Sequence, residues 1–161
     1  MAANKATVSV SASVLPDDMK AAVSGSITYD LNDGDGDACK WVYFSSSVGT
    51  GSEILIPAGI SYLAGTASDE TSTTHATNDN IEFVVIKHSG FQGDGTTVST
   101  DNIHFNFTDS VAAADTVGNL TLEPGDVWWG RLNGATDLTD FTVIAAGNTV
   151  KLLIYAVIDD V

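Results

Sequence analysis

Apolar and polar residues alternate with a period of two along much of the chain. The clearest runs are residues 7–14 and 103–107, in which every second side chain is apolar. This alternation is typical of β-strands that place one face on a core and the other in solvent. Further β-branched and aromatic segments, separated by clusters of Gly, Asp, Asn and Ser, span residues 26–31, 39–45, 53–57, 81–88, 119–123, 127–132, 141–145 and 150–158.

These segments predict an all-β fold, because the chain shows no sustained helical period. Short strands with turn residues between them are typical of an antiparallel β-sandwich or jelly roll, here of roughly eight to ten strands. The 161 residues fit a single domain, residues 1–161, in which residues 1–15 form an N-terminal strand or arm. Short helices are predicted at residues 16–23 and 109–114, and long loops at residues 64–80 and 91–101.

The segment Glu123–Asp126 carries the clearest turn signal. Pro124 presets φ at the second position and Gly125 accepts a positive φ at the third, as a type II turn requires. We expect this turn to join two antiparallel strands.

Residues 150–158 are apolar on both faces of their predicted strand. One face holds the even-numbered positions from Val150 to Ile158, and the other holds Lys151, Leu153, Tyr155 and Val157. Such a strand is either central and covered or faces a partner chain. Leu153 and Tyr155 are therefore candidate interface residues.

Trp128 and Trp129 are adjacent and precede Arg131, the only arginine in the sequence. Neighbouring residues in a strand point to opposite faces, so one tryptophan should enter the core and the other should stand outside beside Arg131. Tryptophan and arginine are enriched at protein interfaces. We take all three as candidate interface residues, with a covered aromatic or a sugar-stacking platform as alternatives.

The charge balance excludes some partners. Asp and Glu total 21 against 6 Lys and Arg, a formal net charge of −15. A field of this sign repels phosphate backbones and anionic lipid surfaces, so we expect neither nucleic acid nor a membrane as a partner. Cys39 is the only cysteine, which excludes an intramolecular disulfide.

Asp33, Asp35 and Asp37 alternate with glycines, as in the first half of an EF-hand loop. Ca²⁺ favours several oxygen ligands, and glycine allows a loop to wrap tightly around the ion. The twelfth position from Asp33 is Phe44, where an EF-hand has a glutamate, so a complete EF-hand is excluded. The segment is either a solvated hairpin turn or a looser Ca²⁺ site, and no other cofactor is predicted.

Recognised catalytic motifs are absent from the sequence. His75, His88 and His104 lack zinc-binding spacing, and there is no nucleophile elbow or phosphate-binding glycine pattern. A carboxylate pair for glycoside hydrolysis stays open, since only the folded spacing would reveal it. We therefore expect a non-enzymatic structural or binding protein.

Three segments carry a family resemblance: Lys40–Phe44, Leu122–Arg131 and the closing strand Leu152–Asp160. Together with the acidic, Thr-rich and Ser-rich composition, they resemble small virion structural proteins of tailed bacteriophages. The resemblance implies a jelly-roll or related sandwich on the capsid surface, synthesised in the host cytoplasm.

The role that this resemblance implies is that of a capsid decoration (cement) subunit, bound over seams between major capsid proteins and often a homotrimer. A head fibre or tail component is a close variant, and a carbohydrate- or receptor-binding module is the alternative. A trimer of such acidic chains repels itself, so assembly would need apolar contacts or bound cations.

Overall fold

The computed structural model describes residues 5–10, 25–30, 40–56, 61–64, 71–74, 79–107, 120–132 and 137–159. These ranges contain twelve β-strands and one short 3-10 helix. The strands are β1 (Lys5–Val10), β2 (Gly25–Asp30), β3 (Lys40–Val48), β4 (Glu53–Ile54), β5 (Ser61–Ala64), β6 (Thr71–Thr74), β7 (Asn80–Gln92), β8 (Ile103–Asn106), β9 (Leu120–Leu122), β10 (Val127–Arg131), β11 (Thr142–Ala145) and β12 (Val150–Asp159), and the helix is η2 (Leu138–Asp140).

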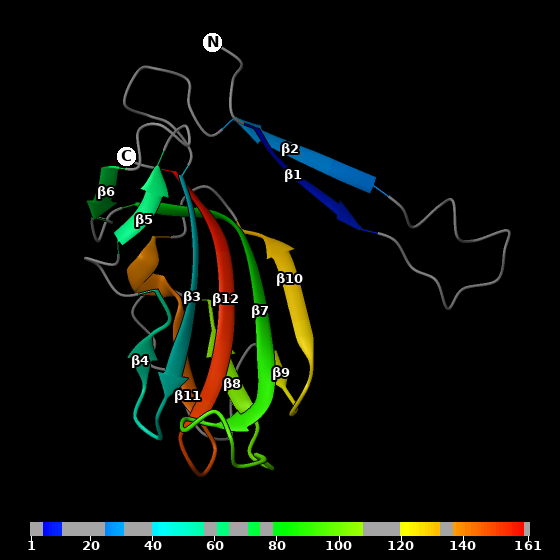
Figure 1. Cartoon of the computed structure of the whole chain (residues 1–161), viewed down its shortest axis with the longest axis vertical. Helices are drawn as coiled ribbons and strands as arrows, with labels where there is room; N and C mark the ends of the chain where they lie inside the picture. Colours follow the sequence, from blue (N-terminus) through cyan, green and yellow to red (C-terminus); the bar gives the residue numbers. More distant parts are fainter. Residues whose placement is uncertain are drawn as a thin grey trace, which may run out of the picture.

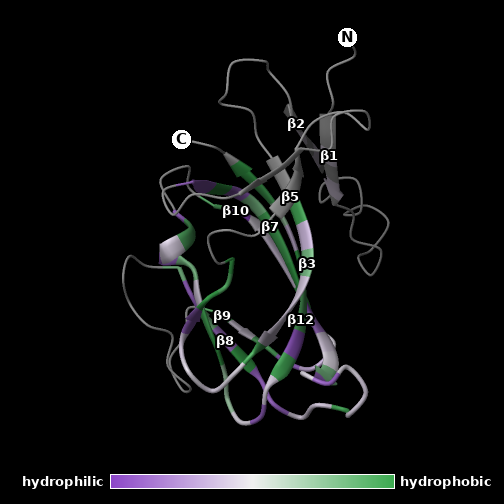
Figure 2. Cartoon of the chain, turned by 60° about the vertical axis from the view of Figure 1, so that its left-hand side comes forward, coloured by the Kyte–Doolittle hydropathy of each residue, from purple (hydrophilic) through white to green (hydrophobic). Residues whose placement is uncertain are grey.

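Two antiparallel sheets form the body of the molecule. The larger sheet has the order β10-β7-β12-β3-β5-β6 and the smaller sheet has the order β4-β11-β8-β9. The larger sheet lies in front of the smaller one in Figure 1, and Figure 2 shows the two layers from the side. β1 and β2 form a separate antiparallel ribbon in the described residues.

The core lies between the inner faces of these two sheets. Alternate residues of β12, from Val150 to Ile158, are buried on the inner face of the larger sheet. Ile103 and Phe105 of β8 and Val143 of β11 are buried on the facing layer. Period-two alternation thus positions each strand, because its apolar face is removed from water only in this orientation.

Aromatic rings fill one part of this core. The Phe105 and Phe141 ring centroids are 5.8 Å apart, and those of Phe107 and Phe141 are 4.7 Å apart. Both pairs are tilted, an arrangement that aromatic pairs prefer over face-to-face stacking. Phe141 is completely buried, so its ring ties β8 to the segment that precedes β11.

β12 is the central strand that the sequence predicted as one of two alternatives. It pairs with β3 on one side and with β7 on the other, both antiparallel. The register with β7 shifts between Val157 and Ile158, where a bulge lets both residues be buried.

The prediction of an all-β sandwich is confirmed, and each predicted strand segment overlaps a strand. β5 and β6 were not predicted, and β6 lies within the expected loop at residues 64–80. Their sequences, SYLA and TSTT, lack an apolar alternation, so pairing rather than pattern makes them strands. The twelve strands therefore exceed the predicted number. A jelly-roll order is not confirmed.

The turn at Glu123–Asp126 forms as predicted but does not close a hairpin. Gly125 has a φ of +95°, and Asp126 N–H donates to Glu123 O at 3.0 Å, as in a type II turn. β9 pairs with β8 and β10 pairs with β7, so the turn links the two sheets. The expectation that it joins one antiparallel pair is wrong, because Leu122 and Trp128 on either side of it enter the core from opposite layers.

The other local predictions have mixed outcomes. The helices expected at residues 16–23 and 109–114 lie outside the described residues, as does most of the expected N-terminal arm beyond β1. The loop expected at residues 91–101 begins late, because β7 continues to Gln92 and Phe91 bridges to Val98.

Candidate interaction surface

The solvent-facing side of the larger sheet, which we call the outer face, brings together residues from four strands. These are Val127, Trp129 and Arg131 of β10, Phe83, Val85 and Lys87 of β7, Lys151, Leu153, Tyr155 and Val157 of β12, and Tyr43, Ser45 and Ser47 of β3. In Figure 1 these strands form the front of the sandwich.

One register row crosses the middle of the outer face. Trp129 is opposite Val85, Val85 is opposite Tyr155, and Tyr155 is opposite Tyr43. Neighbouring strands lie about 4.8 Å apart, so cross-strand neighbours in such a row contact one another. The row places three aromatic side chains and one valine across the sheet.

Much of this apolar surface is accessible to solvent. The exposed fractions are 63% for Tyr43, 53% for Val127 and 47% for Trp129. Phe83 and Val157 form a small buried cluster on the same face, and the half-buried Val85 and Tyr155 pack against it. Burial raises the pKa of the Tyr155 hydroxyl, as expected for a phenol set among apolar side chains. A contiguous apolar patch of this kind marks an interaction site more often than isolated apolar residues do.

The adjacent tryptophans point to opposite sides of the sheet, as predicted. Trp128 packs against the core, and its ring centroid lies 5.2 Å from that of Phe107. Trp129 stands on the outer face. Trp128 is therefore half-buried against the core and does not lie on the outer face. The other four candidate interface residues, Trp129, Arg131, Leu153 and Tyr155, lie on one face.

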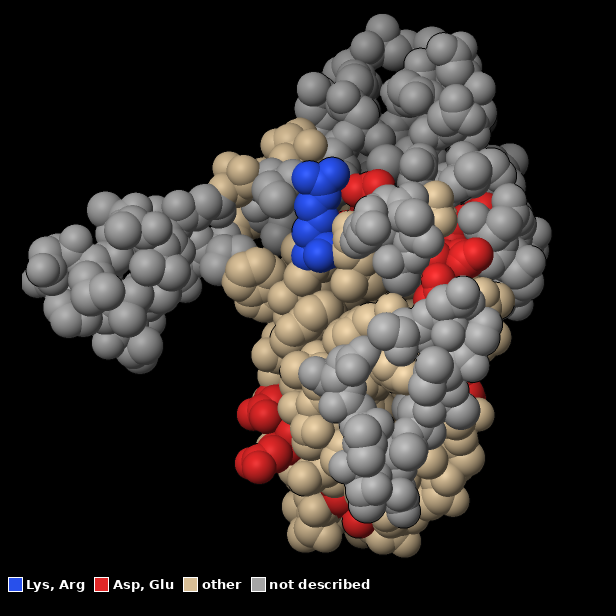
Figure 3. All heavy atoms as spheres, turned by 180° about the vertical axis from the view of Figure 1, so that it is seen from behind, with Lys and Arg blue, Asp and Glu red and all other residues tan. Residues whose placement is uncertain are grey.

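Basic residues gather on the outer face. Lys87, Lys151 and Arg131 are three of the six Lys and Arg residues in the sequence. Arg131 pairs with Glu82 at 3.4 Å. Figure 3 shows the opposite side of the molecule, where acidic side chains lie at several separate places and a basic side chain is also visible beside acidic atoms. The outer face therefore differs in charge from the chain as a whole.

Sequence reasoning missed part of this surface. Tyr43, Val127, Val85 and Lys87 belong to it because of the strand register, which pairs β3 and β7 with β12. A partial signal was present, since Val127, Trp129 and Arg131 alternate along one strand.

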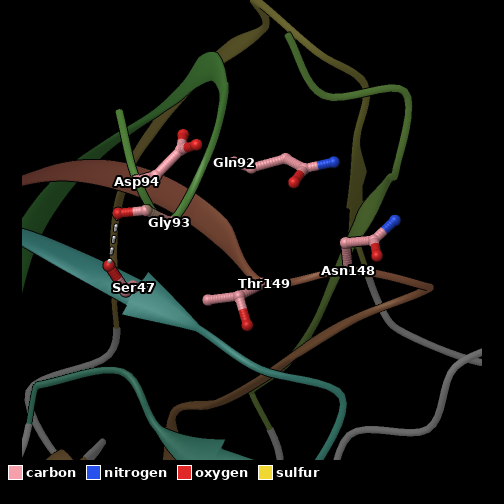
Figure 4. Close-up of a pocket in the computed structure, with 6 residues that line it drawn as sticks. All are labelled: Ser47, Gln92, Gly93, Asp94, Asn148 and Thr149. Carbon is pink, nitrogen blue, oxygen red and sulfur yellow. Dashed lines mark hydrogen bonds between the residues drawn. The ribbon is translucent and has the colours of Figure 1, made fainter. Parts of the chain in front are cut away.

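An open pocket of about 450 Å³ lies at one end of the larger sheet. Figure 4 shows the residues that line it, which are Ser47, Gln92, Gly93, Asp94, Asn148 and Thr149. Asp94 is the one titratable residue among them. Its carboxylate accepts hydrogen bonds from Thr97 Oγ1 at 2.6 Å and from the Thr96 and Thr97 N–H groups at 2.9 Å. These bonds lower the pKa of Asp94 and commit its oxygens to the loop. The pocket lining therefore contains no nucleophile–base pair.

The Asp101 carboxylate links the β7–β8 loop to the β11–β12 loop beside this pocket. It accepts from Asn148 Nδ2 at 2.9 Å and from Asn148 N–H at 3.0 Å, and these bonds lower its pKa. A Cβ atom on Gly147 would collide with the same carboxylate, so this turn needs glycine.

We expect Asp101→Asn to lower stability at neutral pH by about 1 kcal/mol, since the charge-assisted bonds weaken in a partly exposed, screened site. Because folding lowers the pKa of Asp101 below its ordinary value of 3.8, its contribution is present above about pH 4 and is lost as the pH falls through the folded value. Urea unfolding between neutral pH and acid should therefore show a shallower acid loss for the variant. Parallel curves for the two proteins would contradict this role.

The predicted calcium ligands Asp33, Asp35 and Asp37 lie outside the described residues. Elsewhere, the described part of the chain contains no cluster of three or more His, Cys, Asp or Glu side chains suited to a metal ion. The described residues also include no helix with the length and apolar character needed to cross a membrane.

Comparison with known proteins leaves the outer face as the main guide to function. No protein-family model matches the chain, and a search of curated proteins finds no match.

Proposed function

We propose that the chain is a non-enzymatic structural subunit of a phage virion, of the capsid decoration type, and that it assembles through its outer face. The observation that carries the proposal is the aromatic row in which Trp129 and Tyr43 are exposed and Tyr155 is half-buried. None of these three side chains belongs to the main core between the sheets. Burial of such a row against another protein gains free energy roughly in proportion to the apolar area removed from water.

Other features of the chain agree with an assembly role. The residues that line the described pocket are uncharged apart from Asp94, whose oxygens are occupied by the loop. Hydrogen bonds from backbone N–H groups to the carboxylates of Asp94 and Asp101 also hold the loops in which these residues lie. A decoration subunit needs a stable sandwich, a contact face and shaped loops, and it needs no active site.

We expect the full chain to cosediment with capsids of the phage that encodes it, at a fixed ratio of subunits to shell. Trp129→Ala should weaken this attachment by about 30-fold or more, because buried tryptophans at contact centres commonly contribute at least 2 kcal/mol. A subunit that no longer assembles with its neighbours would also bind the shell at fewer points and lose avidity. The measurement is a cosedimentation titration.

Val98→Ser is the control, since Val98 is 70% exposed and lies in the β7–β8 loop, outside the register rows of the outer face. It should bind like the unchanged chain. A folded chain with no affinity for the shell would overturn the proposal.

Carbohydrate binding is the second candidate function. The aromatic row favours it, because rings on a flat sheet can stack on sugar faces. Retardation of the chain in gels that contain soluble polysaccharide, lost in Trp129→Ala, would identify this role.

A further inference from the structure

Among the described residues, the outer face carries basic side chains although the chain as a whole is very acidic. It carries Lys87, Lys151 and Arg131, and Arg131 pairs with Glu82. The three other cations of the sequence are left with the remaining 20 of its 21 acidic residues. Lys87 is exposed and lies in the register row below the aromatic one, between Val127 and Leu153. Cations therefore border the apolar surface on the same face.

We propose that the occupant of the outer face is the acidic surface of a second copy of this chain, in a head-to-tail contact. The inference rests on the proposed function, because it names the partner of that same face. Each copy then offers both halves of a complementary contact, a cationic aromatic face and an acidic surface. Heterologous contacts of this kind close into rings when the rotation between copies permits.

Charge argues against the alternative contact, in which two outer faces meet. That arrangement would bury Lys87 and Lys151 of both copies, while Glu82 is already engaged by Arg131. Burying ammonium groups without a carboxylate partner is costly. A head-to-tail contact instead supplies carboxylates to these lysines.

The head-to-tail contact also resolves the repulsion between copies. Chains of net charge −15 repel one another at long range. When the cationic face of one copy covers acidic groups of the next, the closest charges across the contact have opposite signs. Apolar contact then adds attraction that salt does not screen.

Sedimentation velocity of the full chain tests this inference. We expect an oligomer in which the effect of a charge reversal at the contact is largest at about 0.05 M NaCl and shrinks at about 0.5 M, because salt screens the charges across the contact. Lys87→Glu should weaken association at least tenfold at low salt. Lys5→Glu, which makes the same charge change in β1, should leave association unchanged.

Mixing distinguishes the two geometries. If outer faces met each other, Lys87→Glu mixed with the unchanged chain would associate more tightly than either protein alone, and this result would overturn the proposal. In a head-to-tail contact the mixture gains nothing.

The remaining outcomes separate this inference from the proposed function. An oligomer that is broken by Trp129→Ala but is insensitive to Lys87→Glu at low salt would overturn the acidic partner and leave the assembly role standing. A strictly monomeric chain would overturn the inference, whatever the capsid experiment shows. A monomer retarded by polygalacturonate would also overturn it and would assign the face to an anionic glycan.

Discussion

Phe141→Ala is expected to destabilise the protein by about 4 kcal/mol, the largest loss of stability that we predict for a single substitution. Phe141 is completely buried, and its ring contacts Phe105 and Phe107 from the segment leading into β11. Truncation removes the transfer free energy of the ring and leaves a cavity between two layers that cannot collapse freely. Urea unfolding followed by far-ultraviolet circular dichroism measures the loss.

Phe91→Ala makes the same chemical change at a residue that is 39% exposed. It should cost less than about 1 kcal/mol, since the side chain leaves no closed cavity behind. Similar losses at the two positions would mean that the Phe141 ring does not fill the core beside β8 as described.

His88→Leu is expected to cost about 2–3 kcal/mol, the second largest effect, although leucine has a similar size and is apolar. His88 is completely buried in β7 and both of its ring nitrogens are bonded. Gly90 N–H donates to Nδ1 at 3.0 Å, so Nε2 carries the proton and donates to the carbonyl oxygen of Asp101 at 2.9 Å. Leucine would leave both backbone groups without these partners.

His104→Leu is the matched control for this prediction. His104 is half-buried, and its Nδ1 lies 2.9 Å from Thr121 Oγ1 near solvent, which can replace the lost bond. Its cost in urea unfolding should stay below about 1 kcal/mol. Equal costs at the two histidines would show that burial of the His88 partners is not what matters.

Strand positions were predictable because period-two alternation reports directly which side of a strand is buried. β7, β8 and β12 all follow this rule, and their segments were identified from the sequence. β5 and β6 were not, since a strand such as TSTT is held by backbone pairing and carries no apolar pattern. The turn at Gly125 was predictable in type but not in connectivity, because local dihedral preferences do not say which neighbour each strand selects.

Residues of the outer face were predictable only where they alternate along a single strand. Trp129 and Arg131 alternate along β10, and Leu153 and Tyr155 alternate along β12. Tyr43 joins them through pairing with a strand far away in sequence. His88 stood out in the sequence only as a histidine without zinc-ligand spacing. Its structural role was not predictable, because its partners are backbone groups, which have no sequence signature.

The central position of β12 has a consequence for how the protein is made. β3 and β7 do not pair with each other but both pair with β12, which follows them in the chain. On the ribosome, the larger sheet therefore cannot form until β12 has emerged, and until then β3 and β7 present unpaired edges. Contacts between such distant segments slow folding and expose nascent chains to aggregation. Production of this protein should therefore benefit from slow synthesis at low temperature, when fewer incomplete chains coexist.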